Sequence, residues 1–228
     1  MNLSPSPLDN PAHNSLVEAH QNFAIGNNEL KLYRPNVCTF GGIKMEDNPS
    51  DIFDPYILPG QPFFIIGKKP NLPAHIVLEK EIVCLQMVCA VPVKMAFTEK
   101  IILLKKEHHG VLFELINLVQ PGYFQKETPL MGDYFGIFKN GQLVAVAGER
   151  MRMFDYTEIS AVVTRPGFTG KGFAKQLVAH TVNKNFAENK IPYLHVVESN
   201  VGAIKLYHKL GFATRRKISF WKLKRTPV

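Results

Sequence analysis

Apolar residues recur at two different spacings in the C-terminal part of the chain, and the spacing changes at a glycine-rich stretch. The run 159–163 is apolar and rich in β-branched residues, which predicts a buried strand. Residues 164–174 follow and read Thr-Arg-Pro-Gly-Phe-Thr-Gly-Lys-Gly-Phe-Ala. Ala174, Leu177 and Thr181 then recur at helical spacing. The pattern therefore predicts a strand, a glycine-rich turn and a helix in direct succession.

Strand and helix patterns alternate from about residue 98 to the end of the chain. The predicted strands are 101–104, 134–138, 143–148, 156–164, 193–197 and 214–223, and the predicted helices are 111–119, one beginning near 174, and 201–210. Asn140-Gly141 lies between two of these strands and indicates a tight hairpin, and Gly211 marks the end of the last helix. These elements predict an α+β fold with a mixed, mostly antiparallel central sheet flanked by helices.

A smaller α/β half precedes this region, and we expect an N-terminal domain of residues 1–97 and a C-terminal domain of residues 98–228. The N-terminal pattern predicts a helix near 10–24 and strands at 30–33, 63–66, 76–78 and 82–89. It also predicts a proline-broken loop over 34–42, and turns around one short helical piece over 47–62. This half contains no glycine-rich turn and no paired carboxylates. We expect it to pack against the C-terminal domain or to form a wall of a substrate pocket.

Composition and net charge indicate an anionic binding partner but do not identify it. Of the 228 residues, 46% are hydrophobic and 20% are charged, as in ordinary globular proteins, and the net charge is +8. A basic chain suits an anionic cofactor or a nucleic acid. The densest basic cluster lies within 215–225, where a solvated strand edge is the simpler interpretation. No aromatic-interleaved basic patch accompanies it, so nucleic acid is not an expected partner.

The cysteines and the apolar runs indicate the cellular compartment in which the protein is expected. Cys38, Cys84 and Cys89 match no zinc-binding spacing, so no metal is expected, and three cysteines cannot all pair with one another. A reducing, cytoplasmic setting is the expectation. No run of about 18 apolar residues predicts a membrane span, and residues 1–11 do not have the pattern of a signal peptide.

Four interpretations of the glycine-rich turn can be compared with its residues. A P-loop requires a glycine five positions before Gly170 and a hydroxyl after Lys171, and both are missing. A dinucleotide-binding fingerprint counted from Gly170 requires a third glycine at Lys175. A purely structural turn remains possible, beside an anion site formed by the unpaired N–H groups at the start of the helix.

A second block of residues resolves that choice. Residues 200–212 read Asn-Val-Gly-Ala-Ile-Lys-Leu-Tyr-His-Lys-Leu-Gly-Phe. Together with residues 162–177 and 193–199, this block resembles the GNAT superfamily of acyl-CoA N-acyltransferases, over roughly residues 98–225. The chain departs from the usual turn motif, because Gly167 and Thr169 stand where the family commonly has longer polar side chains.

The resemblance implies that acetyl-CoA, or a related acyl-CoA, is the co-substrate. Its pyrophosphate is expected on the backbone N–H groups of residues 168–174, and its pantetheine arm on the exposed backbone where the strand 156–164 splays from its neighbour. The expected contacts are Val162, Val163, Thr164, Phe168, Thr169, Gly170, Lys171, Gly172, Phe173, Ala174, Asn200 and Tyr207. Lys171 or Lys175 is expected to offset the charge missing from the turn motif.

The resemblance also implies two catalytic residues. Glu158, near the start of the strand that leads into the turn, is the candidate base, with a surface or ion-paired carboxylate as the alternative. Tyr207 is the candidate general acid for the leaving thiolate, and core packing is its alternative. Asn200 is expected to cap the last helix as well as to touch CoA.

Other polar residues are weaker candidates for the site. Glu149 and Arg150 are reserve candidates for the acceptor pocket, and Glu198 is a reserve base. The default interpretation of His195 is a hydrogen-bonded core histidine. His108 and His109 are interpreted as surface residues.

The expected function is transfer of an acetyl or other short acyl group from acyl-CoA to a primary amine. The alternative is an acyl-CoA-binding sensor that has lost catalysis. The acceptor is not encoded in any recognisable motif, and it is expected to depend on loops near 120–133 and 149–156 and on the N-terminal half. A homodimer that pairs through the terminal strand is one alternative, and a solvated edge strand is the other.

Overall fold

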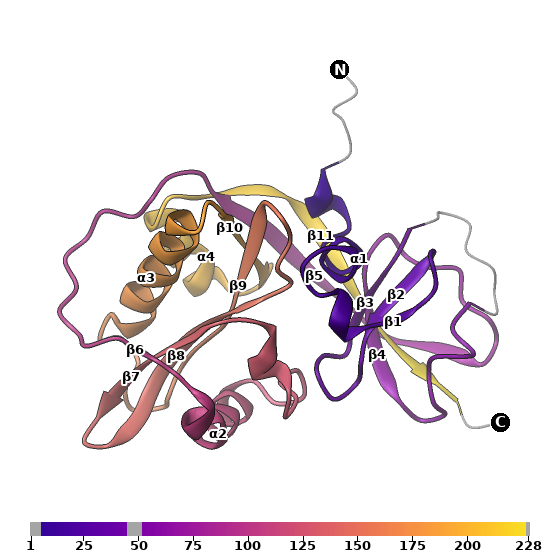
Figure 1. Cartoon of the computed structure of the whole chain (residues 1–228), viewed down its shortest axis with the longest axis horizontal. Helices are drawn as coiled ribbons and strands as arrows, with labels where there is room; N and C mark the ends of the chain where they lie inside the picture. Colours follow the sequence, from indigo (N-terminus) through magenta and orange to yellow (C-terminus); the bar gives the residue numbers. More distant parts are fainter. Residues whose placement is uncertain (1–5, 45–51, 227–228) are drawn as a thin grey trace.

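The computed structural model describes residues 6–44 and 52–226, and a single mixed sheet runs through both halves of the chain (Figure 1). Its strands are β1 (Ala24–Gly26), β2 (Leu30–Tyr33), β3 (Phe40–Ile43), β4 (Pro62–Gly67), β5 (Ile76–Cys89), β6 (Ile102–Leu103), β7 (Tyr134–Lys139), β8 (Gln142–Arg150), β9 (Tyr156–Thr164), β10 (Ile191–Val197) and β11 (Phe212–Arg225). The α-helices are α1 (Pro11–Val17), α2 (His109–Val119), α3 (Phe173–Ala187) and α4 (Val201–Lys209). Short 3₁₀ turns are η1 (Pro7–Asp9), η2 (Gln21–Phe23), η3 (Lys106–His108) and η4 (Thr128–Met131).

Neighbouring strands follow the order β1-β2-β3-β4-β11-β5-β10-β9-β8-β7-β6 in this sheet. Over the described ranges only the β3–β4 and β10–β9 pairings are parallel, and the other neighbours are antiparallel. The predicted α+β fold with a mostly antiparallel sheet flanked by helices is confirmed.

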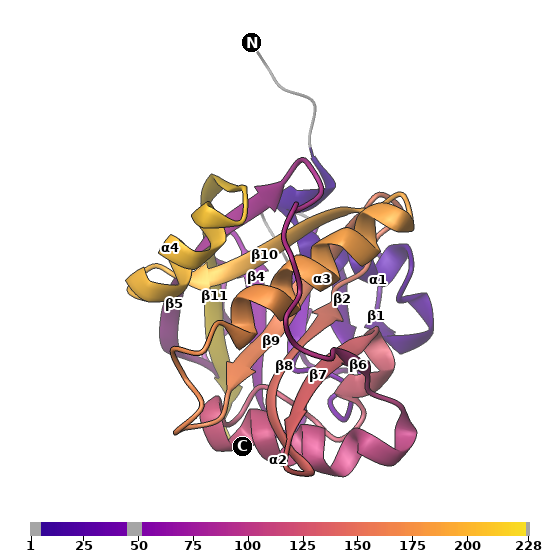
Figure 2. The same cartoon turned by 90° about the vertical axis from the view of Figure 1, so that its left-hand side faces the viewer.

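Helices cover both faces of the C-terminal part of the sheet (Figure 2). On one face, α3 packs through Leu177, Val178 and Val182 into clusters that include β7, β8 and β10, and α4 adds to the same face. On the opposite face, α2 buries Leu112 and Leu115 against β7 and β8. This separation follows from the strands, because successive side chains of a strand point to opposite faces. None of the helices in residues 6–44 and 52–226 is long and apolar enough to cross a bilayer.

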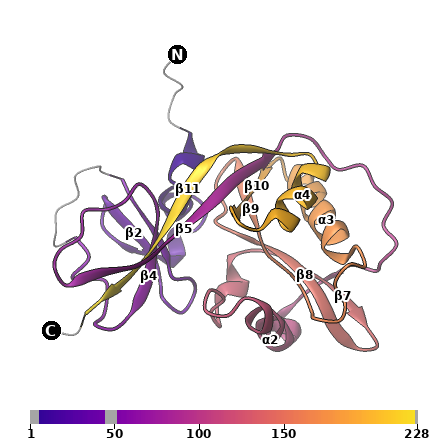
Figure 3. The ribbon, with the colours of Figure 1, turned by 180° about the vertical axis from the view of Figure 1, so that it is seen from behind.

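The strand β5 from the N-terminal half lies between two strands of the C-terminal half. It pairs with β10 over Cys84–Val88 and with β11 over nearly its whole length. The β5–β11 ribbon extends from the helix-covered part of the sheet to the part formed by β1–β4 (Figure 3). Sheet hydrogen bonds therefore cross the expected domain boundary near residue 97, and that boundary stays a prediction.

The N-terminal half differs from expectation in three places. The helix expected near 10–24 is the shorter α1, which ends at Val17, and η2 and the unpredicted strand β1 follow it. The stretch 34–42, expected to be a loop, contains part of β3, and the two expected strands at 76–78 and 82–89 are one strand, β5. Glycines make β3 possible, because a Cβ at Gly41 would lie 2.3 Å from the Leu32 side chain and one at Gly42 would lie 2.2 Å from Asn10 Oδ1. The turns expected over 47–62 fall partly outside the described residues.

Candidate active site

An opening in the sheet lies where β9 and β10 separate. These two parallel strands pair only at Ile191–Tyr193 and Tyr156–Glu158. Beyond that point β10 pairs with β5, while β9 continues along β8. A bulge in β9 accentuates the separation: Ala161 has a φ of 52°, and β9 carries one extra residue opposite Val146–Gly148. The predicted splay of this strand is present in the structure.

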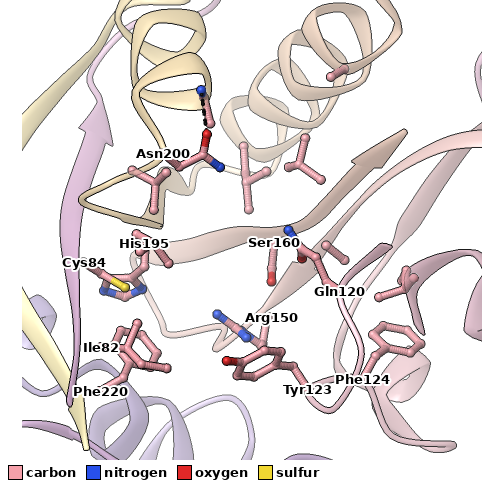
Figure 4. A pocket seen from close by; sticks show the side chains of 18 of the residues that line it. Ile82, Cys84, Gln120, Tyr123, Phe124, Arg150, Ser160, His195, Asn200 and Phe220 are labelled. Atoms are coloured by element: carbon pink, nitrogen blue, oxygen red, sulfur yellow. Dashed lines mark hydrogen bonds between the residues drawn. The ribbon is translucent and has the colours of Figure 1, made fainter. Parts of the chain in front are cut away.

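A cavity of about 460 Å³ occupies this opening (Figure 4). One end is formed by the bulge and by α4, with Ala161, Val162, Asn200 and Tyr207 among its lining residues. The other end reaches residues of the N-terminal half and of β11, including Phe40, Ile82 and Phe220. Both halves of the chain thus contribute walls to one cavity.

The glycine-rich turn exposes unpaired backbone donors beside this opening. Gly167, Gly170 and Gly172 have φ values of 85°, 77° and 76°, which glycine adopts readily. In the part of the chain that the structure describes, the N–H groups of residues 169–174 have no hydrogen-bond acceptor. These donors lie at and just before the start of α3, where the helix dipole is positive, so the turn is suited to an anion.

The turn also corrects one expected contact. The N–H group of Phe168 donates to the carbonyl oxygen of Arg165 at 3.0 Å, so it is not available to a phosphate, and the unpaired donors begin at Thr169. The Phe173 side chain is buried among core residues of β7 and β8, which leaves only its backbone facing the turn. Lys171 and Lys175 are exposed, and the Lys171 ammonium lies 4.9 Å from the centre of the Phe168 ring.

The candidate base Glu158 is fully buried behind the cavity wall. Arg150 binds its carboxylate with two donors, Nε at 2.7 Å and Nη2 at 2.8 Å, and His195 Nδ1 lies 2.7 Å from Oε1. Burial by itself would raise the pKa of Glu158, but the charge and hydrogen bonds of Arg150, with the contact from His195, bring the pKa to about 2. The alternative interpretation of Glu158, an ion-paired carboxylate, is therefore the one that its contacts support, because both of its oxygens are held by neighbouring side chains.

The hydrogen bonds continue from His195 across the sheet to the protein surface. Gln86 Nε2 lies 3.1 Å from His195 Nε2 and donates to the Leu8 carbonyl at 2.8 Å. Arg215, the extra residue of a bulge in β11, donates to Gln86 Oε1 at 2.8 Å and to Asp9 at 2.7 Å. Since the Gln86 amide nitrogen faces the ring, we assign a neutral His195 that donates through Nδ1 to Glu158.

Tyr207 and Asn200 lie at the α4 end of the cavity. The Tyr207 side chain is buried, and within the described ranges its hydroxyl has no protein partner. Burial raises the pKa of Tyr207 to about 12, so the hydroxyl keeps its proton near neutral pH. Asn200 caps α4 by accepting a hydrogen bond from the Ala203 N–H at 3.1 Å, which confirms its expected capping role.

Only some of the other residues expected to contact the cofactor line the cavity. Val162 and Ala174 line it. Val163 instead packs into the core on the α2 face, and Thr164 pairs with Ala145 of β8. A contact from Val163 to a pantetheine arm would therefore have to come from its backbone.

The weaker candidate residues differ in whether they line the cavity. Arg150 lines the cavity, whereas Glu149 is buried in an ion pair with Lys184 at 2.8 Å. Glu198 is exposed and pairs with Lys217. In residues 6–44 and 52–226 no cluster of three His, Cys, Asp or Glu side chains has the arrangement of a metal site. Sequence reasoning ranked Arg150 and His195 low and missed Gln86, because their cross-strand placement is not a motif.

Comparisons with known proteins agree with this architecture. Residues 134–221 match the family model described as FR47-like protein. A GNAT-family protein of Novosphingobium aromaticivorans superimposes with a TM-score of 0.90 at 26% identity, covering 98% of this chain and 100% of that one. None of the curated proteins matches the chain.

Two further solved structures share the fold at lower identity. A GCN5-related N-acetyltransferase from Kribbella flavida has a TM-score of 0.57 at 14% identity, over 94% of this chain and 96% of its own. A GCN5-related N-acetyltransferase-like protein from Streptococcus suis has a TM-score of 0.57 at 15% identity, over 87% of this chain and 82% of its own. The resemblance read from the sequence is confirmed: the chain contains an FR47-like domain and has the fold of the GNAT superfamily.

Proposed function

We propose that this protein transfers an acetyl or other short acyl group from acyl-CoA to an amine. The observation that carries the proposal is the convergence of three features at one opening: the amide-rich turn before α3, the splayed β9 and the unpaired Tyr207 hydroxyl. Each serves a different part of an acyl-CoA molecule. The first suits its pyrophosphate, the second its amide-containing arm and the third its sulfur.

The donor is held mainly by backbone groups in this proposal. The unpaired N–H groups of residues 169–174 bind the pyrophosphate, and Lys171 and Lys175 add charge at the rim. The amides of the pantetheine arm pair with the free edge of β9 beside Val162, as an added strand pairs with a sheet edge. This arrangement directs the thioester to the bulge at Ala161, within the cavity.

The chemistry then needs an amine, a proton acceptor and a stabilised leaving group. The ammonium loses one proton, the amine nitrogen attacks the thioester carbon, and the C–S bond breaks as the adduct collapses. The second amine proton leaves at that step and supplies the departing thiol. Tyr207, whose pKa of about 12 keeps it protonated, donates a hydrogen bond to the sulfur as negative charge develops.

We assign the first proton to His195, with Glu158 as its positioning residue. His195 lines the cavity, and Glu158 lies behind it, ionised and bound to Nδ1 at 2.7 Å. An ionised carboxylate at this position stabilises the imidazolium that forms when Nε2 accepts a proton. The substrate must first displace the 3.1 Å contact from Gln86, whose amide nitrogen keeps its partner at Leu8.

The test of the proposed function has two steps. The melting temperature is measured with and without acetyl-CoA, where ligand at about 100 times its dissociation constant adds roughly 2.7 kcal/mol of stability. Release of free CoA is then measured with a panel of amines. We expect both a thermal shift and amine-dependent release. A shift without release on any amine would identify a binding protein, and the absence of both would refute the proposal.

A further inference from the structure

The cavity contains one full charge, and that charge is positive. Among its lining residues there is no aspartate or glutamate within the described part of the chain, and the only charged side chain is Arg150. Glu158 does not line the cavity, because its carboxylate is covered by Arg150 and His195. An acceptor therefore meets a guanidinium in the cavity and no opposing carboxylate.

The Arg150 guanidinium has N–H donors that Glu158 does not use. Glu158 takes Nε and Nη2, while Nη1 has no partner among the described residues, and the guanidinium points into the cavity (Figure 4). One face of the guanidinium lies 4.6 Å from the centre of the Phe40 ring, which fixes its plane. A fixed guanidinium edge with free N–H groups is suited to a planar carboxylate.

The walls around Arg150 are apolar and aromatic. Phe40, Tyr123, Phe124 and Phe220 line this end of the cavity, and Ile82 joins them. These side chains offer contact area to an apolar or aromatic group, and no carboxylate partner for an ammonium. A second ammonium on the acceptor would be buried beside Arg150 without a counter-charge, at a high desolvation cost.

Arg150 also lies close to the bulge at Ala161 along the sheet. Arg150 pairs with Glu158 across β8 and β9, two residues along β9 from Ser160 and next to the bulge where the thioester is expected. Two residues of a strand span about 6.6 Å. Arg150, Ser160 and Ala161 line the same cavity, so an acceptor whose carboxylate is held at Arg150 lies on the side of the cavity next to the bulge.

We propose that the acceptor is a small amino carboxylic acid with an apolar or aromatic side chain, whose carboxylate binds Arg150. This inference rests on the proposed function and names its substrate class. It separates this cavity from sites for polyamines or lysine side chains, which would need acidic walls. Arg150 acts here as a substrate-binding residue, and Phe40 and Tyr123 contact the apolar side chain.

The first experiment compares acceptors that differ in one group. Acetyl-CoA turnover is measured with phenylalanine, its amide, phenethylamine and spermidine. We expect kcat/KM for phenylalanine to exceed that for its amide and for phenethylamine at least about ten-fold, since a charge-assisted hydrogen bond is lost in each. Equal or better turnover of phenethylamine or spermidine would overturn the inference and leave the proposed function standing.

A second experiment measures binding without turnover. Titration calorimetry with 3-phenylpropionate and its neutral amide, 3-phenylpropanamide, reports the carboxylate contribution directly. We expect the carboxylate to bind at least about ten-fold more tightly in the wild type. Carboxylate-selective binding without any acetyl-CoA shift would support the Arg150 site and refute the proposed function, so the two failures are distinguishable.

Variants of Arg150 test whether the preference for a carboxylate depends on this residue. Arg150→Lys keeps a positive charge beside Glu158 but loses the planar fork, and we expect it to abolish most of the preference for the carboxylate while acetyl-CoA binding is unchanged. Arg34→Lys, at an exposed arginine of the N-terminal half, is the matched control and should keep the preference. If Arg150→Lys does not fold, the charge-neutral pair Arg150→Met with Glu158→Gln replaces it. An undiminished preference in either Arg150 variant would overturn the inference.

Discussion

Replacement of Glu158 by glutamine removes the negative charge from the buried centre of the Arg150–Glu158–His195 cluster. Two estimates of the cost agree. The pKa of Glu158 falls from an ordinary value of 4.5 to about 2, which at 1.36 kcal/mol for each pKa unit corresponds to about 3 kcal/mol. Removal of one partner from a buried ion pair costs roughly 3–5 kcal/mol. We therefore expect Glu158→Gln to lower the free energy of unfolding by about 3 kcal/mol at pH 7.

The pH dependence of this loss identifies its cause. Because the pKa of Glu158 is lower in the folded protein, its stabilising contribution is present above about pH 4.5 and is lost as the pH falls toward 2. The difference between wild type and Glu158→Gln should therefore shrink from about 3 kcal/mol at pH 7 toward zero in this acid range.

The assay is urea denaturation followed by circular dichroism between pH 3 and 7. At the expected cost the melting temperature at pH 7 also falls by roughly 6–12 °C. Glu198→Gln is the matched control, because Glu198 is exposed and pairs with the exposed Lys217, and it should cost less than about 1 kcal/mol. A Glu158→Gln loss below about 1 kcal/mol, or one that does not change with pH, would refute the reasoning.

Three further predictions concern the donor side of the cavity. Gly172→Ala places a Cβ at a φ of 76°, so it should cost about 1–2 kcal/mol in urea unfolding and weaken acetyl-CoA binding. Gly110→Ala, at a helical glycine with open space around it, should have neither effect. Equal behaviour of the two variants would contradict the role of the turn. Tyr207→Phe should leave the acetyl-CoA dissociation constant unchanged in titration calorimetry and lower kcat about 10²-fold, and an unchanged kcat would exclude the hydroxyl from the reaction. The double variant Lys171→Gln, Lys175→Gln should weaken acetyl-CoA binding at low salt more than at high salt, and unchanged affinity at both would show that backbone amides suffice.

Local elements of the C-terminal half could be predicted from the sequence because their signals are local. The strand β9 has the predicted bounds Tyr156–Thr164, and Asn200 caps α4 as its position indicates. Alternation, glycine placement and capping all depend on neighbours within a few residues, so one sequence contains them.

The polar cluster could not be predicted in the same way. The strand β8 was expected to end at residue 148, but it continues to Arg150, and this extension places Arg150 opposite Glu158. Which of Glu149 and Arg150 faces the cavity depends on the pleat and register of β8, and the bulge near Ala161 changes that register along β9. His195 and Gln86 meet only because β5 pairs with β10, a contact between residues more than a hundred positions apart.

The insertion of β5 between β10 and β11 has a practical consequence for dissecting the protein. A fragment that starts at residue 98 would lose β5 and expose unpaired edges on both β10 and β11, which are sites for aggregation. It would also lose Ile82 and Cys84 from the cavity and Gln86 from the side of His195. Fragments cut within 90–100 are therefore expected to regain the cavity only when both are produced together, with β5 supplied by one piece to the sheet of the other.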